Sequence, residues 1–157
     1  MVYIVNQSKP TAINKRGTKI PYKEYIFDSK KEFTFFKDYI ENCGYKYEVH
    51  PQYILMDKLN LDHTTNIRGV SYKPDFVVYN DDGSIKHVYD VKNGFSVYDI
   101  DTGVNLRFKM FEKQFNIPVE VAVVRKNKFK VKILGTTKKF AIKELTSVDY
   151  NWQELFD

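Results

Sequence analysis

Two apolar segments joined by a four-residue turn constrain the fold of this chain more than any other feature. Residues 74–79 and 85–92 are rich in β-branched and aromatic side chains, which favour β-strands. Residues 80–83 between them read Asn-Asp-Asp-Gly, a sequence typical of a tight turn. We therefore expect an antiparallel hairpin over residues 74–92.

The hairpin brings charged residues together. Side chains two residues apart on a strand point to the same face, so Asp90 and Lys92 project together. Asp75 is expected nearly opposite Asp90, within one step of register. Two neighbouring carboxylates raise each other's energy, and a divalent cation removes that cost. The alternative is that Asp75 only begins a strand and that Asp90 and Lys92 face solvent.

The rest of the pattern indicates a single domain over residues 1–157, with a basic arm or loop at residues 1–20. Further strands are expected at residues 22–27, 47–55, 118–124 and 128–133. Helices are expected at residues 29–42, 105–115 and 142–145, and residues 57–69 are expected to form a polar loop. This order predicts an α/β fold with a mixed β-sheet flanked by helices.

Glu32 lies in the first turn of the expected helix over residues 29–42, whose buried stripe is expected to be Phe33, Phe36 and Ile40. The four-residue spacing of Glu32 and Phe36 places the carboxylate at the edge of that stripe. A carboxylate in this position either caps the helix by reaching back to the backbone of Ser29 or serves a site.

The net charge of +5 is distributed unevenly along the chain. Residues 9–31 are rich in lysine, including Lys30 and Lys31, and residues 125–143 hold eight basic residues and no acid. Such stretches suit a polyanion such as DNA, although a solvated lysine-rich surface is the commoner explanation of charge runs in general. The residues expected to touch phosphate in the second stretch are Arg125, Lys126 and Lys128.

The spacing of the hairpin residues resembles a known signature. Pro74-Asp75, a gap of 14 residues and Asp90-Val91-Lys92 are similar to the motif of the PD-(D/E)xK nuclease superfamily, and Gly94 follows where many members place a glycine. The resemblance implies a restriction-endonuclease-like core that hydrolyses DNA with Mg²⁺ or Mn²⁺. The catalytic residues that it implies are Glu32, Asp75, Asp90 and Lys92. The metal ligands that it implies are Asp75, Asp90, the backbone carbonyl of Val91, and Glu32.

The resemblance extends to both sides of the hairpin, over residues 22–124. Residues 27–32 are similar to the first helix of a phage-encoded branch of the superfamily, and residues 50–53 to its glutamine-bearing strand. Gln52 is accordingly expected to support the site. The resemblance also implies phosphate contacts from the helix after the motif, by Arg107, Lys109 and Lys113. His50, His63 and His87 share no metal-ligand spacing and receive no role.

These observations favour a structure-selective endonuclease that cuts branched DNA, such as a Holliday junction, in phage recombination or replication. Symmetric cutting of two strands suggests a homodimer. The alternatives are a restriction-, transposase- or repair-type nuclease, and a DNA-binding module without activity. One cysteine allows no internal disulfide, and the sequence shows neither a signal peptide nor a membrane span. A reducing cytoplasm, the host's if the chain is phage-encoded, is expected.

Overall fold

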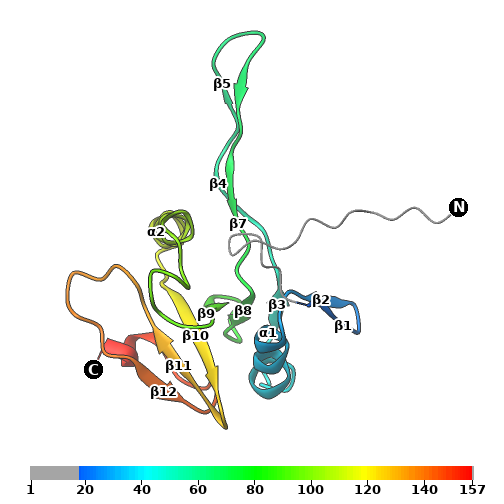
Figure 1. Ribbon diagram of the computed structural model, residues 1–157, viewed down its shortest axis with the longest axis vertical. Helices are drawn as coiled ribbons and strands as arrows, with labels where there is room; N and C mark the ends of the chain where they lie inside the picture. Colours follow the sequence, from blue (N-terminus) through cyan, green and yellow to red (C-terminus); the bar gives the residue numbers. More distant parts are fainter. Residues whose placement is uncertain (1–17, 157) are drawn as a thin grey trace, which may run out of the picture.

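The computed structural model describes residues 18–156 and shows an α/β fold around a six-stranded mixed sheet (Figure 1). The strand order is β12-β11-β10-β9-β8-β3. These strands are β3 (Tyr47–Val49), β8 (Phe76–Tyr79), β9 (Ile85–Val91), β10 (Val119–Arg125), β11 (Lys128–Lys132) and β12 (Lys143–Leu145). β9 and β10 run parallel and the other neighbours antiparallel. The mixed sheet expected from the sequence is confirmed.

Two apolar clusters cover the two faces of this sheet. Alternate residues of β8 separate them, since Phe76 and Val78 belong to one cluster and Val77 belongs to the other. The short helix α1 (Lys30–Phe35) packs into the first cluster, and α2 (Thr102–Phe115) packs into the second. Asp75 and Asp90 are two residues from Val77 and Val88, so both lie on the face that α2 covers.

The expected hairpin is present, with Phe76 opposite Tyr89 and a turn at residues 80–83. Gly83 adopts a positive φ of 87° there, which glycine tolerates without steric cost. The buried strand expected at residues 118–124 is β10, whose first five residues are buried. The helix expected at residues 105–115 is α2, which begins three residues earlier because the Asp101 side chain accepts a hydrogen bond from Val104 N at 2.8 Å.

Two expected strands are interrupted where the backbone turns. Residues 22–27 form not one strand but part of a hairpin, β1 (Ile20–Tyr22) and β2 (Tyr25–Phe27), because Lys23 adopts a φ of 52°. The strand expected at residues 47–55 ends after β3, since His50 also has a φ of 52° and Pro51 follows. The expected arm at residues 1–20 lies almost entirely outside the described residues.

Two helix predictions were wrong in detail. Instead of a helix at residues 142–145, Lys143–Leu145 form the edge strand β12, because Leu145 pairs with Phe129 in the sheet and this pairing overrides local preference. The helix from residue 30 continues beyond α1 as a π-helical turn, Phe36–Ile40, in which Glu41 N donates to Phe36 O. Phe36 and Ile40 are buried as expected, whereas Phe33 is only partly buried and Phe35 and Tyr39 join the buried stripe.

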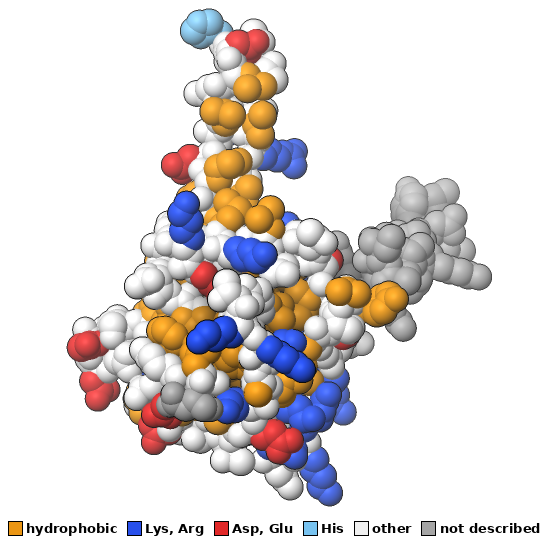
Figure 2. Space-filling model, turned by 90° about the vertical axis from the view of Figure 1, so that its left-hand side faces the viewer, with side chains coloured by type: hydrophobic (Ala, Val, Ile, Leu, Met, Phe, Trp, Pro, Cys, Tyr) orange, Lys and Arg blue, Asp and Glu red, His pale blue; other side chains and the backbone are white. Residues whose placement is uncertain are grey.

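A long β-arm projects from the body of the molecule (Figure 1). It consists of β4 (Tyr53–Met56) paired with β7 (Val70–Tyr72), and then β5 (Leu59–Asn60) paired with β6 (Asn66–Ile67). Hydrophobic side chains line the arm (Figure 2). The polar loop expected at residues 57–69 is thus largely a hairpin. Tyr53 fixes the base of the arm, since its ring packs on Phe111 and Phe115 of α2.

The chain closes with a 3-10 helix, Trp152–Phe156. Within residues 18–156, no helix has the length and apolar character that crossing a bilayer requires.

Candidate active site

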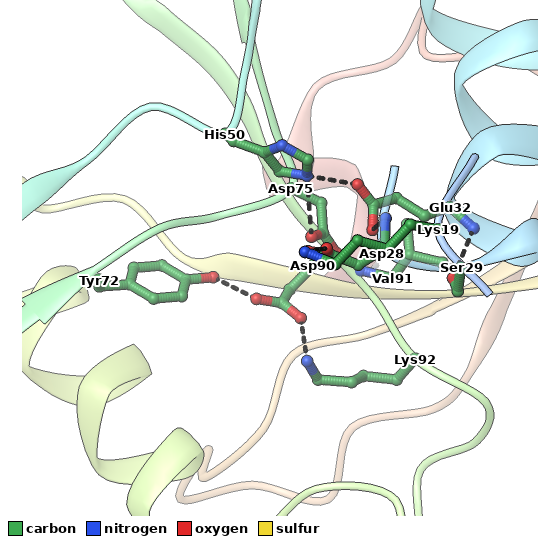
Figure 3. A network of polar contacts seen from close by, with 10 residues as sticks. All are labelled: Lys19, Asp28, Ser29, Glu32, His50, Tyr72, Asp75, Asp90, Val91 and Lys92. Carbon is green, nitrogen blue, oxygen red and sulfur yellow. Dashed lines mark hydrogen bonds and ion pairs between the residues drawn. The ribbon is translucent and has the colours of Figure 1, made fainter. Parts of the chain in front are cut away.

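Asp75 lies immediately before β8, at the end of the sheet where β9 also ends. Its backbone N–H donates to Tyr89 O at 3.0 Å, which continues the ladder between the two strands. Its side chain then takes the next place in that ladder, because Asp75 Oδ2 accepts from Val91 N at 2.7 Å. The carboxylate is therefore held at the end of β9, beside Asp90 (Figure 3).

Asp90 projects from β9 and is only 4% exposed. Tyr72 donates its hydroxyl to Asp90 Oδ2 at 2.7 Å, and the Lys92 ammonium pairs with Asp90 Oδ1 at 2.5 Å. The tyrosine, from the base of the arm, and the lysine thus hold the carboxylate from two sides (Figure 3). The structure places Asp75, Asp90 and Lys92 together on one face, as expected from the sequence.

Glu32 reaches the same place from the first turn of α1. The Ser29 hydroxyl accepts from Glu32 N at 3.1 Å, and Glu32 Oε2 accepts from Asp28 N at 3.3 Å. The helix cap is therefore present, but the carboxylate reaches back to Asp28 rather than to Ser29 as expected. Its other oxygen contacts His50. The cap and the site are both served by this one side chain, which is 3% exposed.

His50 links Glu32 to Asp75, although the sequence suggested no role for it. Its Nε2 contacts Glu32 Oε1 and lies 3.9 Å from Asp75 Oδ1, while its backbone N donates to Asp75 O at 3.0 Å. The left-handed backbone at His50, which costs a non-glycine residue free energy, turns the ring into the site. The hydrogen bond with Glu32 raises the pKa of His50 above its ordinary value, against the opposing effect of burial.

The excess of carboxylates in this cluster of side chains favours the binding of a cation. Burial, followed by the negative charges of Asp90 and Glu32, raises the pKa of Asp75 well above its usual range. Burial acts to lower the pKa of Lys92, but Asp90 and Asp75 outweigh it, so the ammonium is held charged. One ammonium faces several carboxylates. Asp28, Glu32 and His50 also offer ligand atoms within 4.8 Å of one another, a possible metal-binding group.

Basic residues border the carboxylates on one side. A cleft of about 960 Å³ contains Asp75, Val91 and Lys92 in its lining, together with Asp28, Lys30 and Lys31. A smaller cleft of about 340 Å³ is lined in part by Asp90 and Lys92, together with Tyr72 and Arg107. Lys30, Lys31 and Arg107 therefore line the clefts beside the carboxylates.

The remaining residues expected to assist are farther from these clefts. Lys109 points to the loop at Gly135, and Lys113 is exposed near the end of α2. Lys128 is paired with Glu144 at 2.9 Å, whereas Arg125 and Lys126 are exposed at the turn between β10 and β11.

Gln52 is exposed in the segment between β3 and β4, and it lines neither cleft. The neighbouring His50 occupies the place expected for it. A conspicuous signal for His50 in the sequence is the Pro51 that follows it, which marks a break in the strand.

Comparison with known proteins yields a family but no characterised relative. No curated protein and no solved structure matches the chain. The model of one family, described as "Protein of unknown function (DUF1064)", matches residues 13–131. This match covers the whole candidate site, from Asp28 to Arg107, and well over half of the chain, so the chain belongs to the DUF1064 family.

Proposed function

We propose that this protein is a metal-dependent DNA endonuclease of the PD-(D/E)xK type, built on a restriction-endonuclease-like core. The observation that carries the proposal is the meeting of Asp75 and Asp90 with Lys92 at the end of a β-hairpin, beside a glutamate from a helix N-terminus. This arrangement suits the hydrolysis of a phosphodiester, whose transition state gains negative charge beside the metal ligands and a fixed ammonium.

The donor set fits Mg²⁺ or Mn²⁺. Asp75, Asp90 and the carbonyl of Val91 would provide oxygen ligands for one ion. The raised pKa of Asp75, caused by burial first and then by the negative charges of Asp90 and Glu32, is in keeping with such an ion. Asp28, Glu32 and His50 would hold a second ion, and the imidazole nitrogen favours Mn²⁺ over Mg²⁺ there. A bound divalent ion supplies charge neutralisation at the phosphate and lowers the pKa of a coordinated water.

The chain's own groups have separate tasks. Tyr72 and Lys92 orient Asp90, and the Lys92 ammonium also offers a positive charge to the phosphate or to the attacking water. Val91 N orients Asp75 through its hydrogen bond. Lys30 and Lys31, at the edge of the larger cleft, would hold the DNA backbone on the side of α1.

The substrate that we propose is branched DNA, as in phage recombination or replication. The resemblance to small phage nucleases supports this over restriction-, transposase- or repair-type cutting. An inactive DNA-binding module would not need four intact ionic groups, two of which, Glu32 and Asp90, are almost completely buried. The homodimer expected from symmetric cutting stays a prediction, and so does the location in the cytoplasm.

The test is cleavage of four labelled DNAs, namely a four-way junction, a flap, a single strand and a linear duplex, with Mg²⁺ and with Mn²⁺. Wild type should cut at least one of them, and Asp75→Asn should cut more than about a hundredfold more slowly. Asp82→Asn, in the exposed turn of the same hairpin, is the matched control and should cut normally. A wild type that cuts none of the four, in either metal, refutes the proposal.

A further inference from the structure

The loop between β9 and α2 forms one wall of the larger cleft. This loop, residues 92–101, follows the last hairpin strand directly. Lys92, Asn93 and Asp99 from the loop line the cleft together with Lys30 and Asp75. Val97 and Tyr98, at the tip of the loop, directly precede the cleft-lining Asp99 in the chain.

The loop is closed on itself by a compact set of hydrogen bonds. Asp99 Oδ2 accepts from the Ser96 hydroxyl at 2.6 Å and from Ser96 N at 3.2 Å, while Asp99 N and Ile100 N donate to Ser96 O. A Cβ at Gly94 would lie 2.6 Å from Asp99 Oδ2, so the base of the loop closes tightly over a glycine. Ile100, 7% exposed, anchors the far end in the apolar cluster under α2.

The tip of this closed loop is apolar and directed outward. Tyr98 is 97% exposed and Val97 81%, the highest values among the large hydrophobic side chains of the described residues. The backbone of Tyr98 is nevertheless held, because its N–H donates to the Ser96 hydroxyl oxygen at 3.3 Å. A hydrogen-bonded turn thus presents an aromatic ring and a neighbouring branched side chain to solvent, in a loop whose Asp99 lines the cleft together with Lys30 and Lys31.

An aromatic ring beside a phosphate-binding cleft matches the chemistry of an unpaired nucleotide. The backbone of such a nucleotide meets the cations, and its base stacks on the ring, which is sequence-tolerant because every base has a π-face. Bases inside an intact duplex are stacked on one another and do not offer a free face. The charged cleft alone would hold either form of DNA.

We propose that Tyr98 is a specificity-determining residue whose ring stacks on an unpaired base next to the phosphate in the cleft. Val97 packs against the same base or its sugar. The preferred substrates are then DNAs with single-stranded or frayed nucleotides beside the cut, such as flaps and ends, rather than fully paired duplexes. This proposal rests on the proposed function, because it takes the cleft to be the place where DNA is cut.

The experiment compares binding of a flap DNA and of a blunt duplex of equal length, with Ca²⁺ replacing Mg²⁺. The flap carries the fluorescent base 2-aminopurine at successive unpaired positions, so that stacking on a ring quenches its emission. The variants are Tyr98→Ala and Tyr98→Phe. Leu61→Ala, at an exposed apolar position on the β-arm, is the control.

Tyr98→Ala should weaken flap binding about ten- to a hundredfold, the range for one base-stacking aromatic. It should also abolish the quenching and leave duplex binding within about twofold. Tyr98→Phe and Leu61→Ala should both behave as wild type. An equal loss of affinity for flap and duplex, or no loss for either, overturns the proposal.

Cleavage of the same two DNAs with Mg²⁺ distinguishes the role of Tyr98 from the proposed nuclease function. If wild type cuts both DNAs and Tyr98→Ala leaves the ratio of rates unchanged, the role of Tyr98 is refuted while the proposed function stands. If the Tyr98-dependent binding is present but wild type cuts neither DNA, the base contact stands and the proposed function falls. If wild type binds neither DNA, both fall.

Discussion

Replacing His50 by asparagine tests the part of the site that the sequence did not reveal. Asparagine tolerates the left-handed backbone at this position and keeps a hydrogen-bond donor for Glu32, but it removes the imidazole nitrogen. The ligand group of Asp28, Glu32 and His50 then loses its only nitrogen donor. We therefore expect a weaker Mn²⁺ site in a protein that still folds.

The magnitude follows from linkage between binding and folding. At an Mn²⁺ concentration about a hundred times the dissociation constant, wild type gains about 2.7 kcal/mol, and a tenfold weaker variant gains about 1.4 kcal/mol. For a domain of this size, each kcal/mol moves the melting temperature by about 2–4 °C. Wild type should thus gain about 5–10 °C with Mn²⁺, and His50→Asn about half as much or less. The gain with Mg²⁺ should differ less between the two proteins.

The pH dependence has opposite signs with and without metal. Because the pKa of His50 is raised in the folded protein, its pairing with Glu32 stabilises most fully below the ordinary histidine pKa of about 6.5. This contribution is lost as the pH rises through the folded-state pKa. The Mn²⁺ gain should instead grow with pH, since the ion must displace protons from His50 and from Asp75.

The assay is thermal unfolding of wild type and His50→Asn with and without each ion, at about pH 6 and about pH 8. His63→Asn, on the exposed β-arm, is the matched control. An equal Mn²⁺ gain in wild type and His50→Asn would show that the imidazole is not a ligand, and an Mn²⁺ gain that shrinks with pH would contradict the sign argument.

Two further predictions concern charge. The logarithm of DNA affinity should fall linearly with the logarithm of salt concentration, and replacing Lys30 and Lys31 by glutamine should reduce that slope by about two. The same change at Lys138 and Lys139, which line a separate pocket, should leave the slope unchanged. Equal slopes for wild type and both variants would contradict the placement of DNA in the cleft. Burial raises the pKa of Glu112 to about 7, so its proton-linked stabilisation is fully present below about pH 4.5 and is lost as the pH rises through about 7. Glu112→Gln keeps an acceptor for Val119 N. Its free energy of unfolding in urea, relative to that of wild type, should therefore rise by up to about 3 kcal/mol between about pH 5 and about pH 8. A difference between the two proteins that does not change with pH would contradict this prediction.

The sequence predicts the hairpin and its acidic face because the signals there are local. Alternation places Asp90 with Lys92, the turn at residues 80–83 sets the register within a step, and together these bring Asp75 to Asp90. The buried strand β10 and the helix α2 carry equally direct patterns of apolar residues.

The features that were missed depend on backbone conformation or on distant pairing. A left-handed residue at His50 breaks one strand and places its ring between Glu32 and Asp75, and no spacing rule links residues 28, 32, 50 and 75. Tyr72 reaches Asp90 because the base of the β-arm packs against α2, where the Tyr72 ring contacts Phe111. The strand β12 exists because β11 offers it an edge. Each of these outcomes is decided by tertiary contacts that local propensity does not encode.

The measurement closest to the central claim is cleavage and binding of one DNA by wild type and by Asp90→Asn. Asparagine keeps the shape of this buried side chain and an oxygen that can accept from the Tyr72 hydroxyl, but it removes the charge that would hold the ion. With Mg²⁺, we predict that Asp90→Asn nicks the best substrate at least about a hundredfold more slowly than wild type. With Ca²⁺, its affinity for the same DNA should equal or exceed that of wild type, because a negative charge beside the phosphate is gone. Equal cleavage rates for the two proteins would contradict the account.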